Sequence, residues 1–140
     1  MSRHQLVLAR MASCVAMGLI LSAGLSGCAA NPSEARRATK QVTVSVDSDG
    51  IPVATPDTVR AHENDKVHWV FQGPAAKEFA VKFTNVANSP FEWSEQKGAS
   101  LWGTVKSGAL KDRKETEYKY SVDVEGKAKD PKIIIEPKTL

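Results

Sequence analysis

Sulfur is scarce in this chain of 140 residues, and what there is lies near the N-terminus. The two cysteines are Cys14 and Cys28, and the three methionines are Met1, Met11 and Met17. A domain formed by the rest of the chain has no intramolecular disulfide, so packing and hydrogen bonds must hold it together. About 110 residues are enough to bury a core in this way. The same residues lack the thiolate on which blue-copper electron transfer depends.

Catalytic motifs are also missing. There is no G-x-S-x-G nucleophile motif, no phosphate-binding glycine loop and no haem-attachment motif. His62 and His68 are the only histidines after residue 28, which leaves few arrangements for a nucleophile, a base and an orienting group. The sequence therefore predicts a protein that is not an enzyme, with no catalytic residue and no cofactor.

The N-terminus has the three zones of a secretory signal peptide. Residues 1–10 carry Arg3 and Arg10 and no acid, and residues 11–25 form an apolar run broken only by small residues. A membrane-spanning helix needs about 20 apolar residues. Because this run is shorter and contains glycine, it favours a signal peptide over a transmembrane helix.

The quartet Leu25-Ser26-Gly27-Cys28 resembles a bacterial lipobox. The resemblance implies a diacylglyceryl group on the Cys28 sulfur, cleavage that removes residues 1–27, and acylation of the new amine. Ala29 resembles the pattern of Gram-negative lipoproteins sent to the outer membrane. We expect a protein held in the cell envelope by lipid on Cys28, facing the periplasm if the cell is Gram-negative. The alternative is an ordinary signal peptide that happens to contain a cysteine.

Cleavage changes the charge balance. The full chain has 19 Lys and Arg against 16 Asp and Glu, a net charge of +3. Arg3 and Arg10 leave with residues 1–27, so the mature chain has 17 against 16 and a net charge of +1. The basic isoelectric point of the precursor therefore gives no support to a nucleic-acid partner, and none is expected.

Residues 28–40 are predicted to be a lipidated tether and residues 41–137 the folded domain. The tether is rich in small, polar and charged residues. Arg36, Arg37 and Lys40 can contact anionic lipid, although clusters of this kind are more often simply solvated.

The domain has the pattern of short strands between turns. Apolar and polar residues alternate over 42–46, 66–71, 79–83 and 117–124, with weaker extended segments at 51–54 and 58–61. The segment 85–106 is predicted to be irregular with one or two short strands, and 126–131 to be a polar loop. Three consecutive isoleucines at 133–135 indicate a strand buried on both faces. Seven or so strands predict an all-β fold, an antiparallel Greek-key β-sandwich.

The segment 57–69, with Asn64-Asp65 at its turn, resembles the strand–turn–strand of cupredoxins. Residues 79–81 resemble the cupredoxin strand before the first copper histidine, and 118–121 the strand that leads into the ligand loop. The resemblance covers residues 41–136 and implies a cupredoxin-like sandwich. The chain also resembles a group of uncharacterised bacterial proteins, through Ser89-Pro90-Phe91 and Asp130-Pro131, and that similarity implies no activity.

The copper ligands of the cupredoxin pattern are absent. Ser121 stands roughly where the cysteine is expected, and no histidine follows it. A blue-copper site needs a thiolate and two imidazoles. The resemblance therefore implies the fold without copper.

His62 and His68 flank a predicted turn and can form a weak divalent-metal site with Glu63 or Asp65. Two ordinary surface histidines are the more common outcome, and structural zinc usually needs four Cys or His ligands. No metal is therefore assigned. By strand alternation, His68 is predicted to point away from Trp69 toward solvent.

Phe91, Trp93 and Trp102 are the candidate partner-binding residues. Aromatic side chains on an irregular segment can stack on a sugar or form a protein-binding hot spot, and they can equally plug one end of the core. We expect a lipid-anchored, non-catalytic binding or structural module whose partner is the membrane and an envelope protein or glycan. Two alternatives remain open: a small-ligand or divalent-metal carrier using His62 and His68, and an inhibitor of an envelope hydrolase.

Overall fold

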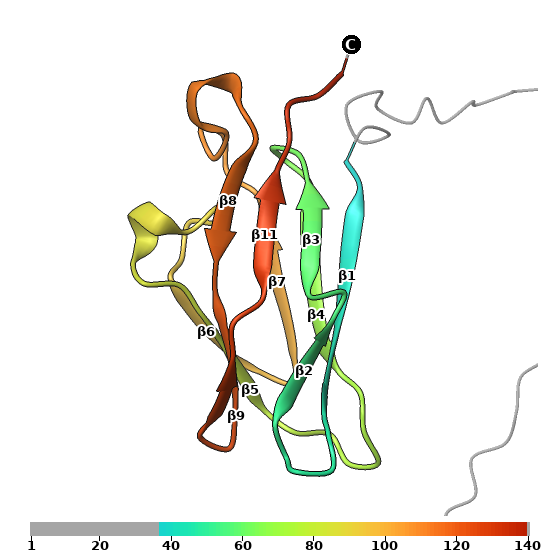
Figure 1. Cartoon of the computed structure of the whole chain (residues 1–140). Coiled ribbons are helices and arrows are strands. Elements are labelled where there is room, and N and C mark those ends of the chain that lie inside the picture. The colour runs from blue at the N-terminus through green and yellow to red at the C-terminus, as the bar shows by residue number, and fades with distance from the viewer. Residues whose placement is uncertain (1–36, 140) are drawn as a thin grey trace, which may run out of the picture.

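The computed structural model describes residues 37–139, which form an all-β domain (Figure 1). Cys28 and the predicted signal peptide lie outside the described residues. The strands are β1 (Thr39–Val46), β2 (Pro52–Thr55), β3 (Thr58–Ala61), β4 (Lys66–Phe71), β5 (Phe79–Lys82), β6 (Glu95–Gly98), β7 (Ser100–Thr104), β8 (Thr116–Lys119), β9 (Ser121–Val124), β10 (Lys127–Lys129) and β11 (Lys132–Ile135), with short 3₁₀ segments η1 (Val86–Asn88) and η2 (Lys111–Arg113). The all-β prediction is confirmed, and the predicted number of strands is too low. Within residues 37–139, no helix has the length and hydropathy to cross a bilayer.

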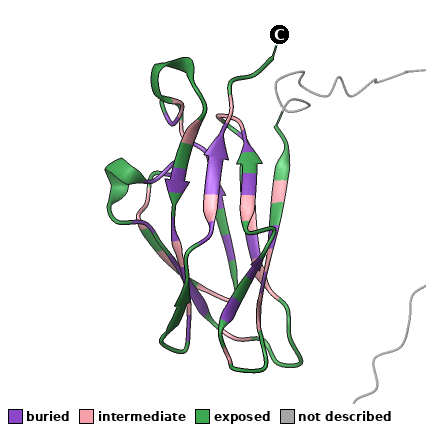
Figure 2. Ribbon diagram, in the orientation of Figure 1, coloured by how far each residue is buried: buried purple, intermediate pink, exposed green. Residues whose placement is uncertain are grey.

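The described strands form three sheets around one core. Their orders are β2-β1-β4-β7, β10-β9-β5-β6 and β3-β11-β8. Alternating residues of all three sheets are buried in one cluster, including Val44 of β1, Trp69 of β4, Val81 of β5 and Ile133 of β11. Buried residues follow the strands, and exposed residues gather in the turns at both ends (Figure 2). This arrangement is consistent with a β-sandwich.

Two of the strand pairs are parallel, which corrects the prediction of an antiparallel sandwich. β1 pairs with β4 in parallel, and β3 pairs with β11 in parallel. The other pairs, such as β1–β2 and β4–β7, are antiparallel. Apolar alternation indicates which face of a strand is buried, but it carries no information about the direction of its neighbour. For this reason the sequence could not reveal the parallel pairs.

The segment 117–124, predicted as one strand, is divided between two sheets. β8 pairs with β11, whereas β9 pairs with β5 and β10. Tyr120 lies at the junction, and its N–H donates to the carbonyl of Pro131 (3.1 Å). Tyr118, Tyr120, Val122 and Val124 are nevertheless all buried. The alternation continues through the bend because both strands turn the same set of side chains toward the shared core.

The predicted loop 126–131 contains a strand. β10 pairs antiparallel with β9 across a turn in which Glu125 (φ 52°) and Gly126 (φ 81°) both have positive φ. Two consecutive residues with positive φ are typical of a two-residue hairpin turn. All three residues of β10 are exposed. Because neither face is buried, the strand has no apolar alternation from which it could be predicted.

The first strand begins at Thr39, two residues before the predicted boundary of the domain. Just before it, the Ala38 N–H donates to Asp65 Oδ1 (3.1 Å), and the Lys66 N–H donates to the Ala38 carbonyl (2.8 Å). Asp65 is almost fully buried (1% exposed) and also accepts from the His62 N–H (3.0 Å). The β3–β4 turn therefore holds the start of the domain.

Aromatic rings fill one part of the core around Trp69. Phe91 and Tyr120 meet Trp69 edge-on, with ring centroids 5.4 and 6.0 Å away. Trp69 Nε1 donates to the Tyr120 hydroxyl (3.2 Å), so both polar atoms are satisfied inside the core. A Cβ at Gly103 of β7 would lie 2.7 Å from the Phe91 ring, so glycine is what lets the ring approach this strand.

Because the phenol of Tyr120 is buried, we expect the free energy of unfolding of the domain to fall at alkaline pH. Burial raises the pKa of Tyr120 to about 12, whereas a free tyrosine ionises near pH 10. The phenol therefore ionises first in the unfolded chain, so its contribution is complete below about pH 10 and is lost as the pH rises toward 12. We expect urea titrations to show a loss of about 2–3 kcal/mol across this range.

The matched control for this prediction is Tyr120→Phe. Burial also raises the pKa of Tyr118, so the variant should keep a smaller alkaline decline. An identical decline in the wild type and Tyr120→Phe would contradict the assignment to Tyr120.

Candidate functional site

The structure separates the three aromatic candidates. Phe91 is fully buried and packs against Trp69 and Phe83, so it has no surface to offer a partner. The prediction of Phe91 as a partner-binding residue is corrected accordingly: it belongs to the core. Trp93 is half-buried and stacks on Phe91, with centroids 4.9 Å apart and an interplanar angle of 10°. With its amide oriented to satisfy both groups, Gln96 accepts from Trp93 Nε1 (3.1 Å).

Trp102 is the candidate that remains at the surface. Its side chain is 50% exposed, more than any other large apolar side chain among the described residues. It lies on the outer side of β7 and stacks on His68 of β4, with centroids 3.8 Å apart and planes 8° apart. His68 Nε2 lies 2.8 Å from the Ser100 hydroxyl. The indole is therefore held flat by a second ring that is itself fixed.

Strand alternation explains why these groups share one side of the sheet. In β7, Leu101 and Gly103 are buried while Ser100, Trp102 and Thr104 are exposed. The register of the sheet places Gln41, His68 and Trp102 in one cross-strand row. His68 therefore points away from the core, as predicted, but under the indole rather than free in solvent.

We call this outer side of the β2-β1-β4-β7 sheet the Trp102 face. By alternation and register it carries Thr39, Gln41, Thr43, Ser45, Val53, Thr55, Lys66, His68, Val70, Ser100, Trp102 and Thr104. Half of these side chains are hydroxyls, only Lys66 is a permanent cation, and none is a carboxylate. The rest of the described domain is densely charged, so this face stands apart as nearly neutral, rich in hydrogen-bonding groups and bearing one exposed aromatic ring.

The open side of the indole is the edge of the sheet. β7 is the last strand in the order β2-β1-β4-β7, so His68 covers Trp102 from one side and no strand of that sheet covers it from the other. A groove of about 280 Å³ beside it is lined by Lys66, Trp102, Gly103 and Thr104. The position offers a flat apolar surface bordered by a hydroxyl and an ammonium group.

The structure does not bring the two histidines to one site. His62 Nδ1 lies 3.5 Å from Asp65 Oδ2, whereas His68 is engaged with Trp102 and Ser100. The predicted carboxylate partners serve the backbone: Glu63 Oε1 accepts from the N–H groups of Gly108 (2.7 Å) and Leu110 (3.1 Å). Within residues 37–139, no three His, Cys, Asp or Glu side chains are grouped as a metal site.

Ser121 lines a cleft where β5 ends and β8 passes into β9. The cleft has a volume of about 350 Å³ and is also lined by Lys82, Phe83, Thr84, Lys119, Tyr120 and Asp130. Blue copper needs sulfur and imidazole ligands. None of the lining residues supplies either, so they do not fit the metal that the cupredoxin resemblance would imply.

The sequence interpretation named Trp102 but missed its setting. Gln41, Ser100 and Thr104 were not candidates, although the alternation of 100–104 carried a signal for a strand with Trp102 on its polar side. Gly98 and Gly103 obscured that signal because glycine is typical of turns. The stacking partner His68 lies 34 positions before Trp102 in the sequence, and only the β4–β7 register brings the rings together.

Comparison with known proteins adds no family, since no protein-family model and no curated protein sequence matches this chain.

Proposed function

We propose that this protein is a lipid-anchored, non-catalytic module of the cell envelope that binds a glycan on the Trp102 face. The observation that carries the proposal is the exposed indole of Trp102, stacked on His68 at the edge of a hydroxyl-rich sheet face. The domain that presents it is, in this proposal, a Greek-key, cupredoxin-like sandwich without copper.

The chemistry of the face suits a sugar ring. The C–H face of a pyranose is apolar and stacks on a flat aromatic ring, while its hydroxyls need donors and acceptors around that ring. Trp102 supplies the ring, and Thr104, Gln41 and Lys66 are the polar neighbours on the same face. A preorganised indole loses little entropy on binding. Lys66 adds one positive charge, which suits cell-wall glycans that carry a carboxylate.

The lipobox-like quartet that ends at Cys28 supports the location. Two or three acyl chains hold a protein firmly in a bilayer, because each buried CH₂ contributes about 0.8 kcal/mol. Intact-mass measurement of the protein purified from membranes tests this part of the proposal. We expect residues 1–27 to be absent and the mass of the acyl groups to be present. An unmodified Cys28 would refute the anchor.

Trp102→Ala is the variant that tests glycan binding. The substitution removes the stacking surface, so we expect retention on purified peptidoglycan and affinity for a soluble chito-oligosaccharide to fall at least about tenfold. The melting temperature should change little, because Trp102 is half-exposed. Affinity is measured by titration calorimetry and retention by co-sedimentation.

Val86→Ala is the matched control, since Val86 is also an exposed apolar residue (45%) and lies in η1, outside the Trp102 face. It should bind both glycans like the wild type. Equal binding by Trp102→Ala and the wild type, or binding of neither glycan by the wild type, would refute the glycan assignment. Capture of an envelope protein that is lost in Trp102→Ala would reassign the face to a protein partner.

A further inference from the structure

The loops at one end of the domain are tied to the point where the chain enters β1. Asp65 of the β3–β4 turn binds the N–H of Ala38, and Glu63 of the same turn binds the loop that precedes β8. The Glu136 N–H donates to the carbonyl of Ala61, which brings the end of β11 to the same place. Figure 1 shows the C-terminal segment, the start of β1 and the loop before β8 at this end. We call it the basic end, and define it as residues 37–40, 60–66, 105–116 and 136–139.

Charge is distributed unevenly between this end and the rest of the domain. The basic end has nine basic side chains, Arg37, Lys40, Arg60, Lys66, Lys106, Lys111, Arg113, Lys114 and Lys138, and five acidic ones, Glu63, Asp65, Asp112, Glu115 and Glu136. The remaining described residues have seven basic and ten acidic side chains. The described residues have a net charge of +1, but this charge is divided into +4 at the basic end (9 − 5) and −3 in the remaining residues (7 − 10). The excess of positive charge therefore lies at the end of the domain where the chain enters β1.

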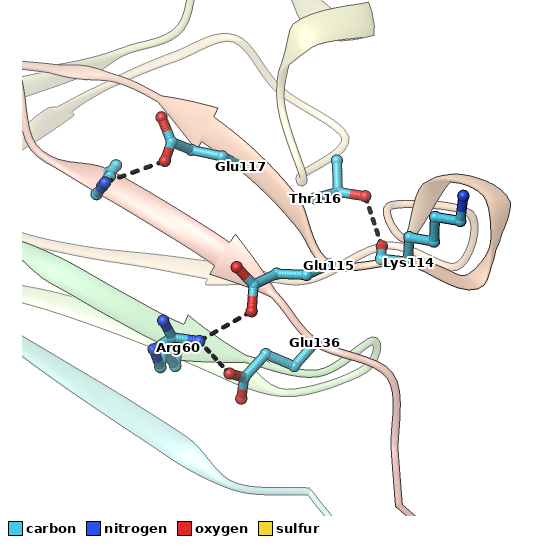
Figure 3. A network of polar contacts seen from close by, with 7 residues as sticks. Arg60, Lys114, Glu115, Thr116, Glu117 and Glu136 are labelled. Atoms are coloured by element: carbon cyan, nitrogen blue, oxygen red, sulfur yellow. Dashed lines mark hydrogen bonds and ion pairs between the residues drawn. The ribbon is translucent and has the colours of Figure 1, made fainter.

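Most carboxylates of the basic end are already engaged. Asp65 and Glu63 accept backbone N–H groups, and Glu115 and Glu136 both bind Arg60 (Figure 3). Elsewhere in the described domain, four of the seven lysines pair with a carboxylate, in Lys77–Glu125, Lys82–Glu95, Lys97–Glu78 and Lys132–Glu117.

The three basic residues of the turn 111–114 have no such partner. Lys111, Arg113 and Lys114 form no ion pair with a carboxylate in residues 37–139. Lys111 Nζ lies over the Tyr118 ring, 5.8 Å from its centroid, a contact that does not neutralise the charge, so all three positive charges are available to an external anion.

The turn that presents these cations is fixed. The Lys111 N–H donates to the Thr116 hydroxyl (2.9 Å). That hydroxyl in turn donates to the carbonyl of Lys114 (2.9 Å; Figure 3). Asp112 (φ 52°) and Arg113 (φ 55°) both have left-handed backbone conformations, which residues other than glycine rarely adopt. Such conformations persist when the surroundings over-determine them. The cations are thus displayed on a rigid projection rather than on a free coil.

We propose that the basic end docks on the anionic phospholipid headgroups of the leaflet that carries the lipid anchor. This inference rests on the proposed anchor at Cys28. Ala38 lies ten residue steps after Cys28, and this stretch can span at most about 35 Å even when fully extended. The anchor therefore keeps the basic end close to the headgroups, where a positive surface meets a negative one. Trp102 lies in the middle of β7, on the side of the domain, so docking leaves the indole open to a glycan, and Lys66 lies where the basic end meets the Trp102 face.

The test uses the native acylated protein reconstituted in vesicles. One set contains phosphatidylcholine alone and the other contains phosphatidylglycerol as well. Lysine amines are labelled with an acetylating reagent, and peptide mass spectrometry gives the rate at each position. We expect Lys111 and Lys114 to react several-fold more slowly on anionic vesicles at low salt. The protection should disappear at about 1 M salt, where the Debye length is about 3 Å.

Lys77, Lys97 and Lys129 are the internal control, because they lie outside the basic end and should react equally on both vesicles. The variant K111Q/R113Q/K114Q should lose the preference for anionic lipid, with about fivefold weaker docking for each charge removed. The variant K77Q/K97Q/K129Q has the same change in charge and should behave like the wild type.

Equal labelling of Lys111 and Lys114 on the two vesicle types would overturn the docking proposal. Flotation with pure phosphatidylcholine vesicles tests the anchor separately, since it depends on acyl chains and not on charge. A protein that fails to float there but floats with anionic vesicles would refute the anchor and keep the docking surface. Protection that inorganic phosphate abolishes as fully as high salt would assign the site to free phosphate and overturn docking on lipid.

Discussion

Phe91→Ala is expected to lower the free energy of unfolding by about 3–5 kcal/mol, a large part of the 5–15 kcal/mol typical of a domain. Phe91 is fully buried, stacks on Trp93 and meets Trp69 edge-on. Removing the ring leaves a cavity lined by rigid aromatic groups. The neighbouring strand at Gly103 has no side chain with which to fill it. Urea denaturation followed by circular dichroism measures the change.

Val86→Ala is the control for this experiment, because Val86 of η1 is 45% exposed and its truncation should change stability by less than about 0.5 kcal/mol. A loss below about 1 kcal/mol in Phe91→Ala would show that the aromatic cluster collapses around the deletion. It would also contradict the role given to Phe91 in the core.

Asp65→Ala is the second substitution with a large expected effect, about 2–4 kcal/mol of destabilisation. Asp65 is 1% exposed, and its two carboxylate oxygens accept the N–H groups of Ala38 and His62. Alanine would leave two part-buried donors without an acceptor, the Ala38 N–H just before β1 and the His62 N–H in the β3–β4 turn. Each such loss costs about 1–3 kcal/mol. Denaturation gives the total, and amide hydrogen exchange at Ala38 and His62 reports the local opening.

Asp65→Asn is the matched variant. Asparagine keeps one acceptor oxygen of the two, so we expect roughly half of the loss and faster exchange at only one of the two amides. Stability of Asp65→Ala within about 0.5 kcal/mol of the wild type would mean that the turn holds the start of β1 by other contacts.

Much of the fold could be predicted because its strands are buried on one face. The alternation of 66–71 and 79–83 predicted β4 and β5 almost residue by residue, and the three isoleucines of β11 are buried on both faces as expected. These predictions succeed because side-chain direction has a period of two in any strand, whatever its partner.

The partners of the strands could not be predicted in this way. The parallel pairs β1–β4 and β3–β11 join strands that are apart in the sequence, and no local pattern encodes them. β10 has no buried face, so it has no pattern at all. The division of 117–124 between two sheets was hidden because the inward alternation of Tyr118, Tyr120 and Val122 continues through the bend.

The candidate site was predictable only in part. The three aromatic residues of the segment 85–106 were compatible with a binding surface and with a plug of the core. The structure contains one of each, since Phe91 is buried in the core and Trp102 is exposed on the surface. Phe91 is buried because Gly103 leaves room for its ring, and Trp102 is exposed because it lies one position before that glycine, on the opposite side of β7. Burial at these positions depends on a contact between distant segments, which composition cannot show.

The pairing of β1 also determines how the domain bears a mechanical load. A pull on the chain at Ala38 acts along β1, whose hydrogen bonds to β4 and β2 run across that direction. The bonds are therefore loaded in shear, so several must break together before the strand can slide out. Tension applied from the N-terminal side would meet its greatest resistance at the first strand, and the rest of the domain would keep its shape until β1 yields.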